Sequence, residues 1–164
     1  MRAILNEQIQ FGRTPIADIT FDPKSRDEIP QLLKGLQYIY CSPEIRKQVF
    51  TVLKKMIPSG TDTKNGRPGM ELWKILVLGT LRLNCNWDYD KLKNIADNHR
   101  SIRLMMGIGT YEEEVSFNLQ TLKDNVRLLT PEILDEINRI VVISGHSLVK
   151  KKRKNSRRAV IPSW

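Results

Sequence analysis

Four polar side chains near the start of one expected helix are the clearest candidates for a functional site. Their types and positions are suited to hydrogen bonds with the edges of DNA bases. The helix is expected to open at Ser116 and carries Asn118, Gln120, Thr121 and Lys123 close to its beginning. In a helix-turn-helix, residues at this end of the recognition helix meet base edges, and Asn and Gln amides suit adenine. The alternative interpretation is a simple solvent-exposed helix face.

Two groups of basic residues offer contacts to phosphate. The C-terminal tail supplies seven of the nine net positive charges, so residues 1–149 carry a net charge of only +2. Such a tail attracts polyanions through counterion release without sequence selectivity, and a solvated, disordered end is the alternative. Lys64 and Arg67 lie in an expected loop, where phosphate contact competes with plain solvation. The tail residues are Lys150, Lys151, Lys152, Arg153, Lys154, Arg157 and Arg158.

The sequence contains no pattern typical of a catalytic or metal site. A two-metal nuclease needs carboxylates that converge on its metal ions. Here Asp88, Asp90 and Asp97 share one short amphipathic segment, and the glutamates of residues 112–114 lie in a glycine-flanked loop. Helix capping and solvation explain both sets. The two cysteines and two histidines are isolated, so we expect buried, reduced thiols, no metal, no cofactor and no enzymatic activity.

Hydrophobic periodicity predicts about seven helices to position these residues. Residues 1–24 have no helical period and are expected to form an extended arm. Helix starts are expected at Ser25, Ser42, Met70, Asp88, Ser101, Ser116 and Thr130. The segment that begins at Met70 is apolar on most faces, so its helix is expected at the centre of a bundle with Trp73 in the core. Residues 139–144 are β-branched enough for a strand, but the continuing period favours helix.

These elements predict an all-α protein, an orthogonal helical bundle with helix-turn-helix-like geometry within residues 70–129. The expected organisation is an arm (1–24), a helical DNA-binding-type domain (25–149) and a disordered basic tail (150–164). No apolar run approaches the roughly 18 residues that a bilayer crossing needs, and the N-terminus lacks a signal-peptide core. We therefore expect no membrane partner and a cytoplasmic, nucleoid-associated location.

Several strings in the chain resemble the N-terminal region of ISNCY-type insertion-sequence transposases. They are FDPKSRDEIP (21–30), LKGLQ (33–37), GRPGMELWKILVLG (66–79), DKL (90–92), ADNHR (96–100) and MMG (105–107). The resemblance covers roughly residues 1–150. It implies a helical region that recognises transposon ends and precedes a DDE catalytic domain of RNase H fold. Magnesium would serve only that second domain.

The similarity stops at the tail. Family members continue with a segment like RCDSFVVETD that leads to the first catalytic aspartate, whereas this chain has RAVIPSW at 158–164. Codons for CDSFVV, read one base late, encode VIPSW and then enter a stop. We therefore expect a frameshift near the lysine run 150–152, and sequencing of the gene tests it: the alternative frame must contain the Thr-Asp continuation.

Together these observations predict a DNA-binding transposase fragment that lacks the DDE carboxylates. Its expected partners are transposon ends or non-specific DNA, with self-association or association with intact transposase. The alternative is a helical protein-interaction module that uses residues 25–57 for oligomerisation and binds nucleic acid only non-specifically.

Overall fold

The computed structural model describes residues 4, 14–22, 24–57, 69–109, 111–112 and 114–145. Over these residues the chain forms seven α-helices and two short 3₁₀ turns, without a strand, which confirms the predicted all-α class. Lys64, Arg67 and the seven basic tail residues lie outside this description. No helix in the described ranges is long and apolar enough to span a membrane.

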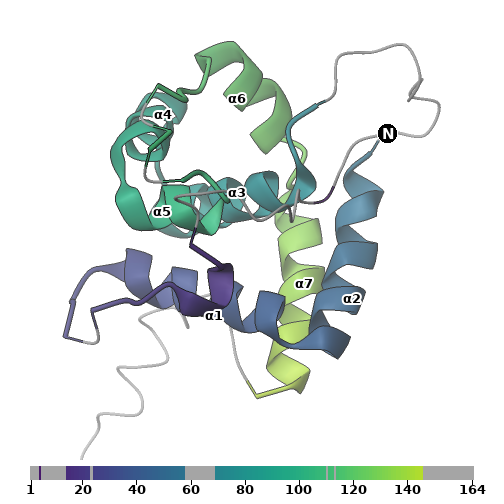
Figure 1. The fold of residues 1–164 in the computed structure, drawn as a ribbon. Helices are drawn as coiled ribbons and strands as arrows, with labels where there is room; N and C mark the ends of the chain where they lie inside the picture. The colour runs from purple at the N-terminus through teal and green to yellow at the C-terminus, as the bar shows by residue number, and fades with distance from the viewer. Residues whose placement is uncertain are drawn as a thin grey trace, which may run out of the picture.

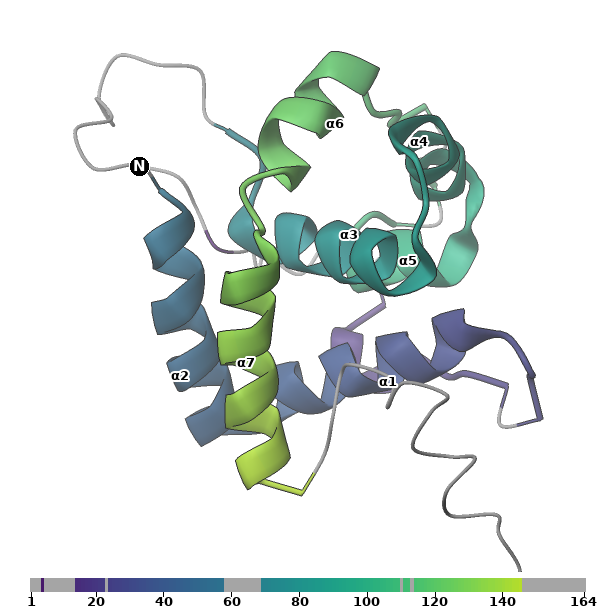
Figure 2. The ribbon, with the colours of Figure 1, turned by 180° about the vertical axis from the view of Figure 1, so that it is seen from behind.

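Three helices form one part of the bundle: α1 (Glu28–Cys41), α2 (Pro43–Leu53) and α7 (Pro131–Ile143). Figures 1 and 2 show α2 and α7 side by side, with α1 running across them. Each helix buries one apolar stripe at the spacing expected from its sequence. The fully buried members are Leu33, Leu36, Ile39, Val49, Leu53, Ile137 and Val141. Residues 139–143 are helical, as the periodicity predicted.

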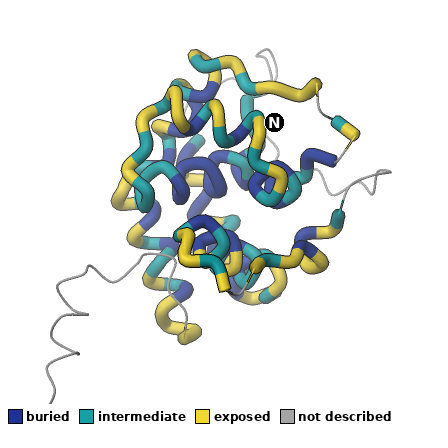
Figure 3. Tube along the Cα trace, turned by 90° about the vertical axis from the view of Figure 1, so that its left-hand side faces the viewer, coloured by how far each residue is buried: buried dark blue, intermediate teal, exposed yellow. Residues whose placement is uncertain are grey.

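Helix α3 (Leu72–Cys85) is the central element, as predicted. Trp73 is fully buried and its indole Nε1–H donates to the Met105 carbonyl at 2.8 Å, so this ring is part of the core. Gly79 lets the segment after α6 approach closely, because an added Cβ would collide with the Leu129 side chain and lie 3.0 Å from its Cβ. Figure 3 shows the buried residues gathered on the inner parts of the chain.

The remaining helices are short: α4 (Tyr89–Asn98), α5 (Arg100–Met105) and α6 (Leu119–Val126). Helix α4 contacts α3, α5 and α6, and α6 also contacts α3. They gather above α1 in the view of Figure 1. Residues 106–118 connect α5 to α6, and the described ones (106–109, 111–112 and 114–118) form neither helix nor strand.

Two helix caps are confirmed. Asp88 Oδ1 accepts from the Lys91 N–H at 2.7 Å, and Thr130 Oγ1 accepts from the Ile133 N–H at 3.3 Å. Helix α2 begins at Pro43 directly after Ser42, although the serine side chain makes no cap bond. A proline in the first helical position loses no hydrogen bond, which explains this start.

Four predicted helix starts were wrong by two residues or fewer, and one of them is Met70, because α3 begins at Leu72. Helix α1 is capped by Asp27, which accepts from Ile29 N–H, while Ser25 supports Asp27. Helix α5 is capped by His99 and begins at Arg100, and α6 is capped by Asn118 instead of Ser116. Where several cap-forming residues stand close together, composition does not identify the one whose side chain reaches an unpaired amide.

Two smaller expectations also needed correction. The predicted extended arm contains a 3₁₀ turn, Ile16–Asp18, and Ile16 and Ile19 are buried. Gln37 Nε2–H donates to their carbonyls at 2.8 and 2.9 Å, which fastens this segment to α1. Cys41 is exposed instead of buried, because it follows the fully buried Ile39 by two residues and so points to the opposite side of α1.

Candidate nucleic-acid interface

The first turn of α6 presents to solvent most of the side chains that the sequence singled out. Asn118, Gln120 and Thr121 are exposed and Lys123 is half-buried. The other side of the helix is packed into the bundle through Leu122, Asn125 and Val126. The polar residues therefore lie on an outward-facing surface, as the amphipathic pattern predicted.

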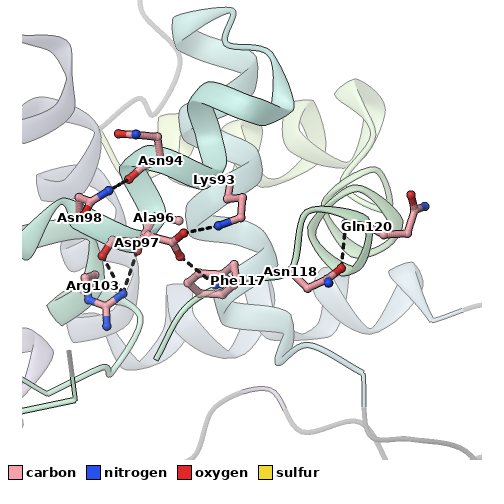
Figure 4. Close-up of polar contacts among 9 residues, drawn as sticks. All are labelled: Lys93, Asn94, Ala96, Asp97, Asn98, Arg103, Phe117, Asn118 and Gln120. Carbon is pink, nitrogen blue, oxygen red and sulfur yellow. Dashed lines mark hydrogen bonds and ion pairs between the residues drawn. The ribbon is translucent and has the colours of Figure 1, made fainter. Parts of the chain in front are cut away.

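Asn118 and Gln120 are already engaged in local hydrogen bonds. Asn118 Oδ1 accepts from the amides of Gln120 and Thr121, at 3.0 and 3.1 Å, and so caps the helix (Figure 4). Gln120 Nε2–H donates to Asp124 Oδ1 at 3.0 Å, one turn further along the helix. A carbonyl oxygen has two lone pairs, so the Asn118 oxygen has no remaining capacity for a base edge.

The chain enters α6 through a hydrogen bond to α4. Phe117, the residue before the cap, donates its N–H to Asp97 Oδ1 at 2.8 Å, and Asp97 Oδ2 pairs with Lys93 Nζ at 2.6 Å. The Asp97 side chain is only 15% exposed, so this ion pair is partly shielded from water. Figure 4 shows Asp97 between Lys93 and Phe117. The approach to α6 is thus fixed by a charge-assisted bond.

Arg103 fastens the same connection at a second place. It is 8% exposed and its guanidinium donates to three backbone carbonyls. Nη1 bonds Ala96 O and Asp97 O, at 3.2 and 3.1 Å, and Nη2 bonds Glu112 O at 2.8 Å. The cation lies where the last carbonyls of α4 lack helical partners, which is favourable for a buried charge.

The surface of α6 carries charges of both signs. Lys123 and the exposed Arg127 are close in sequence to the exposed Asp124, and exposed Glu114 precedes the helix. The charges named here cancel, so the described part of this surface is polar and has no net positive charge. Most of the chain's excess positive charge belongs to the tail, beyond the described residues.

No other place in the described ranges offers an evident reactive centre. These ranges hold no group of three or more His, Cys, Asp or Glu residues suited to a metal ion. A hollow of about 560 Å³ at the α1–α2 junction is mainly lined by Tyr40, Cys41, Arg46 and Phe50, with the Arg46 guanidinium 4.2 Å from the Tyr40 ring centre. Although Cys41 is exposed, partial desolvation by its neighbours and the negative charge of Asp18 raise the pKa of its thiol, which disfavours the reactive thiolate.

Asp97 and Arg103 are the important polar residues whose structural roles sequence reasoning missed. Residue type indicates only a capping or solvated acid at Asp97, and the i,i+4 spacing from Lys93 is the available signal of an ion pair. For Arg103 the signal was a single cation inside the apolar run 102–106. Neither pattern identifies a backbone partner up to 20 residues away in the chain.

Comparisons with protein-family models, with curated proteins and with solved structures gave no match. The helix-turn-helix-like geometry and the transposase resemblance therefore stay predictions from the sequence.

Proposed function

We propose that this chain binds duplex DNA through the first turn of α6, as the end-recognition region of an insertion-sequence transposase. The observation that carries the proposal is the geometry of that turn: an exposed polar face on a helix whose other face is buried and whose start is hydrogen-bonded to α4. A rigidly held, outward-facing helix start is the element that enters a major groove in many DNA-binding folds.

Gln120 and Thr121 are the side chains assigned to base edges. A glutamine amide can pair with adenine through one donor and one acceptor, provided that Gln120 exchanges its bond to Asp124 for the base. Thr121 is exposed and contributes a hydroxyl to either kind of base edge. Asn118 is assigned to the helix cap, because its oxygen already accepts two amides.

Phosphate contacts are assigned to two groups of cations, one on or next to α6 and one elsewhere in the chain. Lys123 and Arg127 lie on or directly after the helix, where they can position it against the backbone. Lys64, Arg67 and the seven tail residues would add affinity that depends on salt and not on sequence. Binding without strand cleavage is the proposed activity of these 164 residues.

The apolar faces of α1 and α2 offer less support for the alternative, an oligomerisation module. Their stripes are occupied inside the chain, with Leu33, Leu36, Val49 and Leu53 fully buried. Self-association through these faces would require the bundle to open. No contact among the described residues favours that alternative.

The test begins with selection of duplexes from a library with a randomised centre, using the intact chain. Binding of the selected duplex and of a scrambled duplex is then compared over a range of salt concentrations. We expect Gln120→Ala to raise Kd for the selected duplex about 5- to 150-fold, the range for one lost bidentate base contact, and to leave the scrambled duplex nearly unaffected.

Gln48→Ala is the matched control, because Gln48 is an exposed glutamine on α2. It should bind both duplexes like the unmodified chain. Equal affinity of the unmodified chain for selected and scrambled DNA would refute the proposal and leave only non-specific attraction.

A further inference from the structure

Helix α6 is short, so few contacts along its own length fix its position. It has eight residues, and the described residues of the connection that leads into it form neither helix nor strand. Apolar contacts of Leu122 and Val126 hold its inner face but do not by themselves fix how its first turn is presented. Directional bonds are needed for that purpose, because apolar packing is not directional.

Asp97 supplies such a bond at the residue that immediately precedes the cap. Its Oδ1 accepts the Phe117 N–H at 2.8 Å, and its Oδ2 is held by Lys93 at 2.6 Å. The cap then aligns the amides of Gln120 and Thr121 through Asn118. The Asp97 bond and the Asn118 cap therefore act on consecutive residues between α4 and the exposed turn, and Figure 4 shows Asp97, Phe117, Asn118 and Gln120 together.

Arg103 limits the other end of the same connection. It bonds the Asp97 carbonyl and the Glu112 carbonyl, five residues before Phe117. Arg103 and Asp97 thus tie Glu112 and Phe117, respectively, to the last turn of α4. The Asp97 bond then decides the approach of α6, whereas Arg103 restrains the connection as a whole.

We propose that Asp97 is a positioning residue that sets DNA sequence discrimination by fixing the first turn of α6. It touches no base in this scheme; it acts through Phe117 and the Asn118 cap. The inference rests on the proposed function. A small displacement of a recognition turn weakens bidentate base contacts, which need aligned donors and acceptors, more than contacts to phosphate.

The experiment compares Asp97→Leu, Asp97→Asn and Lys93→Met in the full chain. Leucine has nearly the same size and no acceptor, asparagine keeps an oxygen for Phe117, and the methionine variant removes only the ion pair. We expect Asp97→Leu to reduce the affinity ratio of selected to scrambled duplex about tenfold or more, as the loss of one charge-assisted bond implies. Affinity for scrambled DNA should stay within about twofold.

Asp97→Asn should retain most of the discrimination, and Lys93→Met should have an intermediate effect. Amide hydrogen exchange at Phe117 should accelerate in Asp97→Leu more than at the other protected amides of the same variant, whereas a general loss of stability accelerates all of them. Val141→Ala, a buried change on α7, controls for lower stability and should leave the ratio unchanged.

The possible outcomes separate this inference from the proposed function. If the unmodified chain does not discriminate between duplexes, both fail. If it discriminates and Asp97→Leu still does so while its Phe117 amide exchanges faster, the positioning role alone is overturned. The role is also overturned if Val141→Ala lowers the ratio as much as Asp97→Leu.

Discussion

The two parts of the bundle are held together by different kinds of interaction. In α1, α2, α3 and α7 the contacts join apolar side chains such as Leu33, Trp73 and Val141, all fully buried. Helices α4, α5 and α6 have ten, six and eight residues, and they are linked in addition by Asp97 and Arg103 bonds to backbone atoms. Apolar burial is common to both parts, and in the second part buried polar bonds to backbone atoms are added between the helices.

The two kinds of interaction have different effects: apolar burial mainly sets the stability of the fold, and polar bonds mainly set the relative positions of its helices. Burial of apolar area stabilises a fold in proportion to the area, largely independently of small shifts between helices. A hydrogen bond weakens steeply when its angle or length departs from the optimum. The polar bonds are therefore suited to hold α6 at a defined place, which is what recognition of a ligand by that helix would require.

Loss of the central indole should have the largest effect on stability. Trp73→Ala removes a fully buried ring that contacts Tyr40 and Phe50, and it leaves the Met105 carbonyl without its donor. We expect the free energy of unfolding to fall by about 3–5 kcal/mol, measured by urea denaturation. Trp73→Phe keeps a ring and should cost less. A loss below about 1 kcal/mol would show that the two parts do not share this core.

Removal of the buried guanidinium should have the next largest effect. Arg103→Met keeps an apolar stem but leaves the carbonyls of Ala96, Asp97 and Glu112 without that donor. We expect a loss of about 2–3 kcal/mol and faster amide exchange in residues 106–118. Arg100→Met is the matched control on the same helix, since Arg100 is exposed, and should change stability by less than about 0.5 kcal/mol.

Similar losses of stability in Arg103→Met and Arg100→Met would show that the buried polar bonds of Arg103 contribute no special stability to the second part of the bundle. The exchange measurement adds a second criterion, because a general loss of stability accelerates exchange throughout the bundle. Acceleration confined to residues 106–118 identifies a local bond. Acceleration that extends equally to α2 and α7 would show that Arg103 has no special connection to α6.

The part dominated by apolar contacts was the more predictable. The spacing of Leu32, Leu33, Leu36 and Ile39 specifies one face of α1, and the apolar density of α3 specifies its central place. The exposed positions of Gln120 and Thr121 also followed from the amphipathic pattern. Such patterns are local: they repeat within one helix and need no knowledge of distant residues.

The polar bonds of Asp97 and Arg103 were not predictable, because their partners are distant in the sequence. Asp97 and Phe117 are 20 residues apart, and the acceptor is specified only when an irregular connection places one amide beside it. The same holds for Arg103 and Glu112. Acids such as Asp97 occur on many solvated helix faces, so residue type alone does not distinguish a structural carboxylate. The capping role of Asn118 was likewise hidden among neighbouring candidates.

His99 provides the smallest expected effect, and one that depends on pH. Its Nδ1 accepts from the Ile102 N–H at 3.4 Å and caps α5, which requires an unprotonated Nδ1. Burial lowers the pKa of His99, and the charge of Asp27 opposes this shift. The folded state binds the proton less readily than the unfolded chain. The stabilisation is therefore complete above about pH 6.5 and is lost as the pH falls through the lower folded-state pKa.

His99→Asn and His99→Ala separate the cap from the titration. Asparagine also caps helices but has no charge change in this range, so its Tm should decline less than that of the unmodified chain between about pH 7.5 and pH 5.5. Alanine should cost about 1 kcal/mol at the upper pH and show the same weak dependence. His146 is present in all three proteins, so its titration does not affect the comparison. Parallel plots of Tm against pH for the unmodified and asparagine proteins would mean that protonation of His99 does not weaken the α5 cap. This polar contact would then be as insensitive to pH as the apolar contacts are.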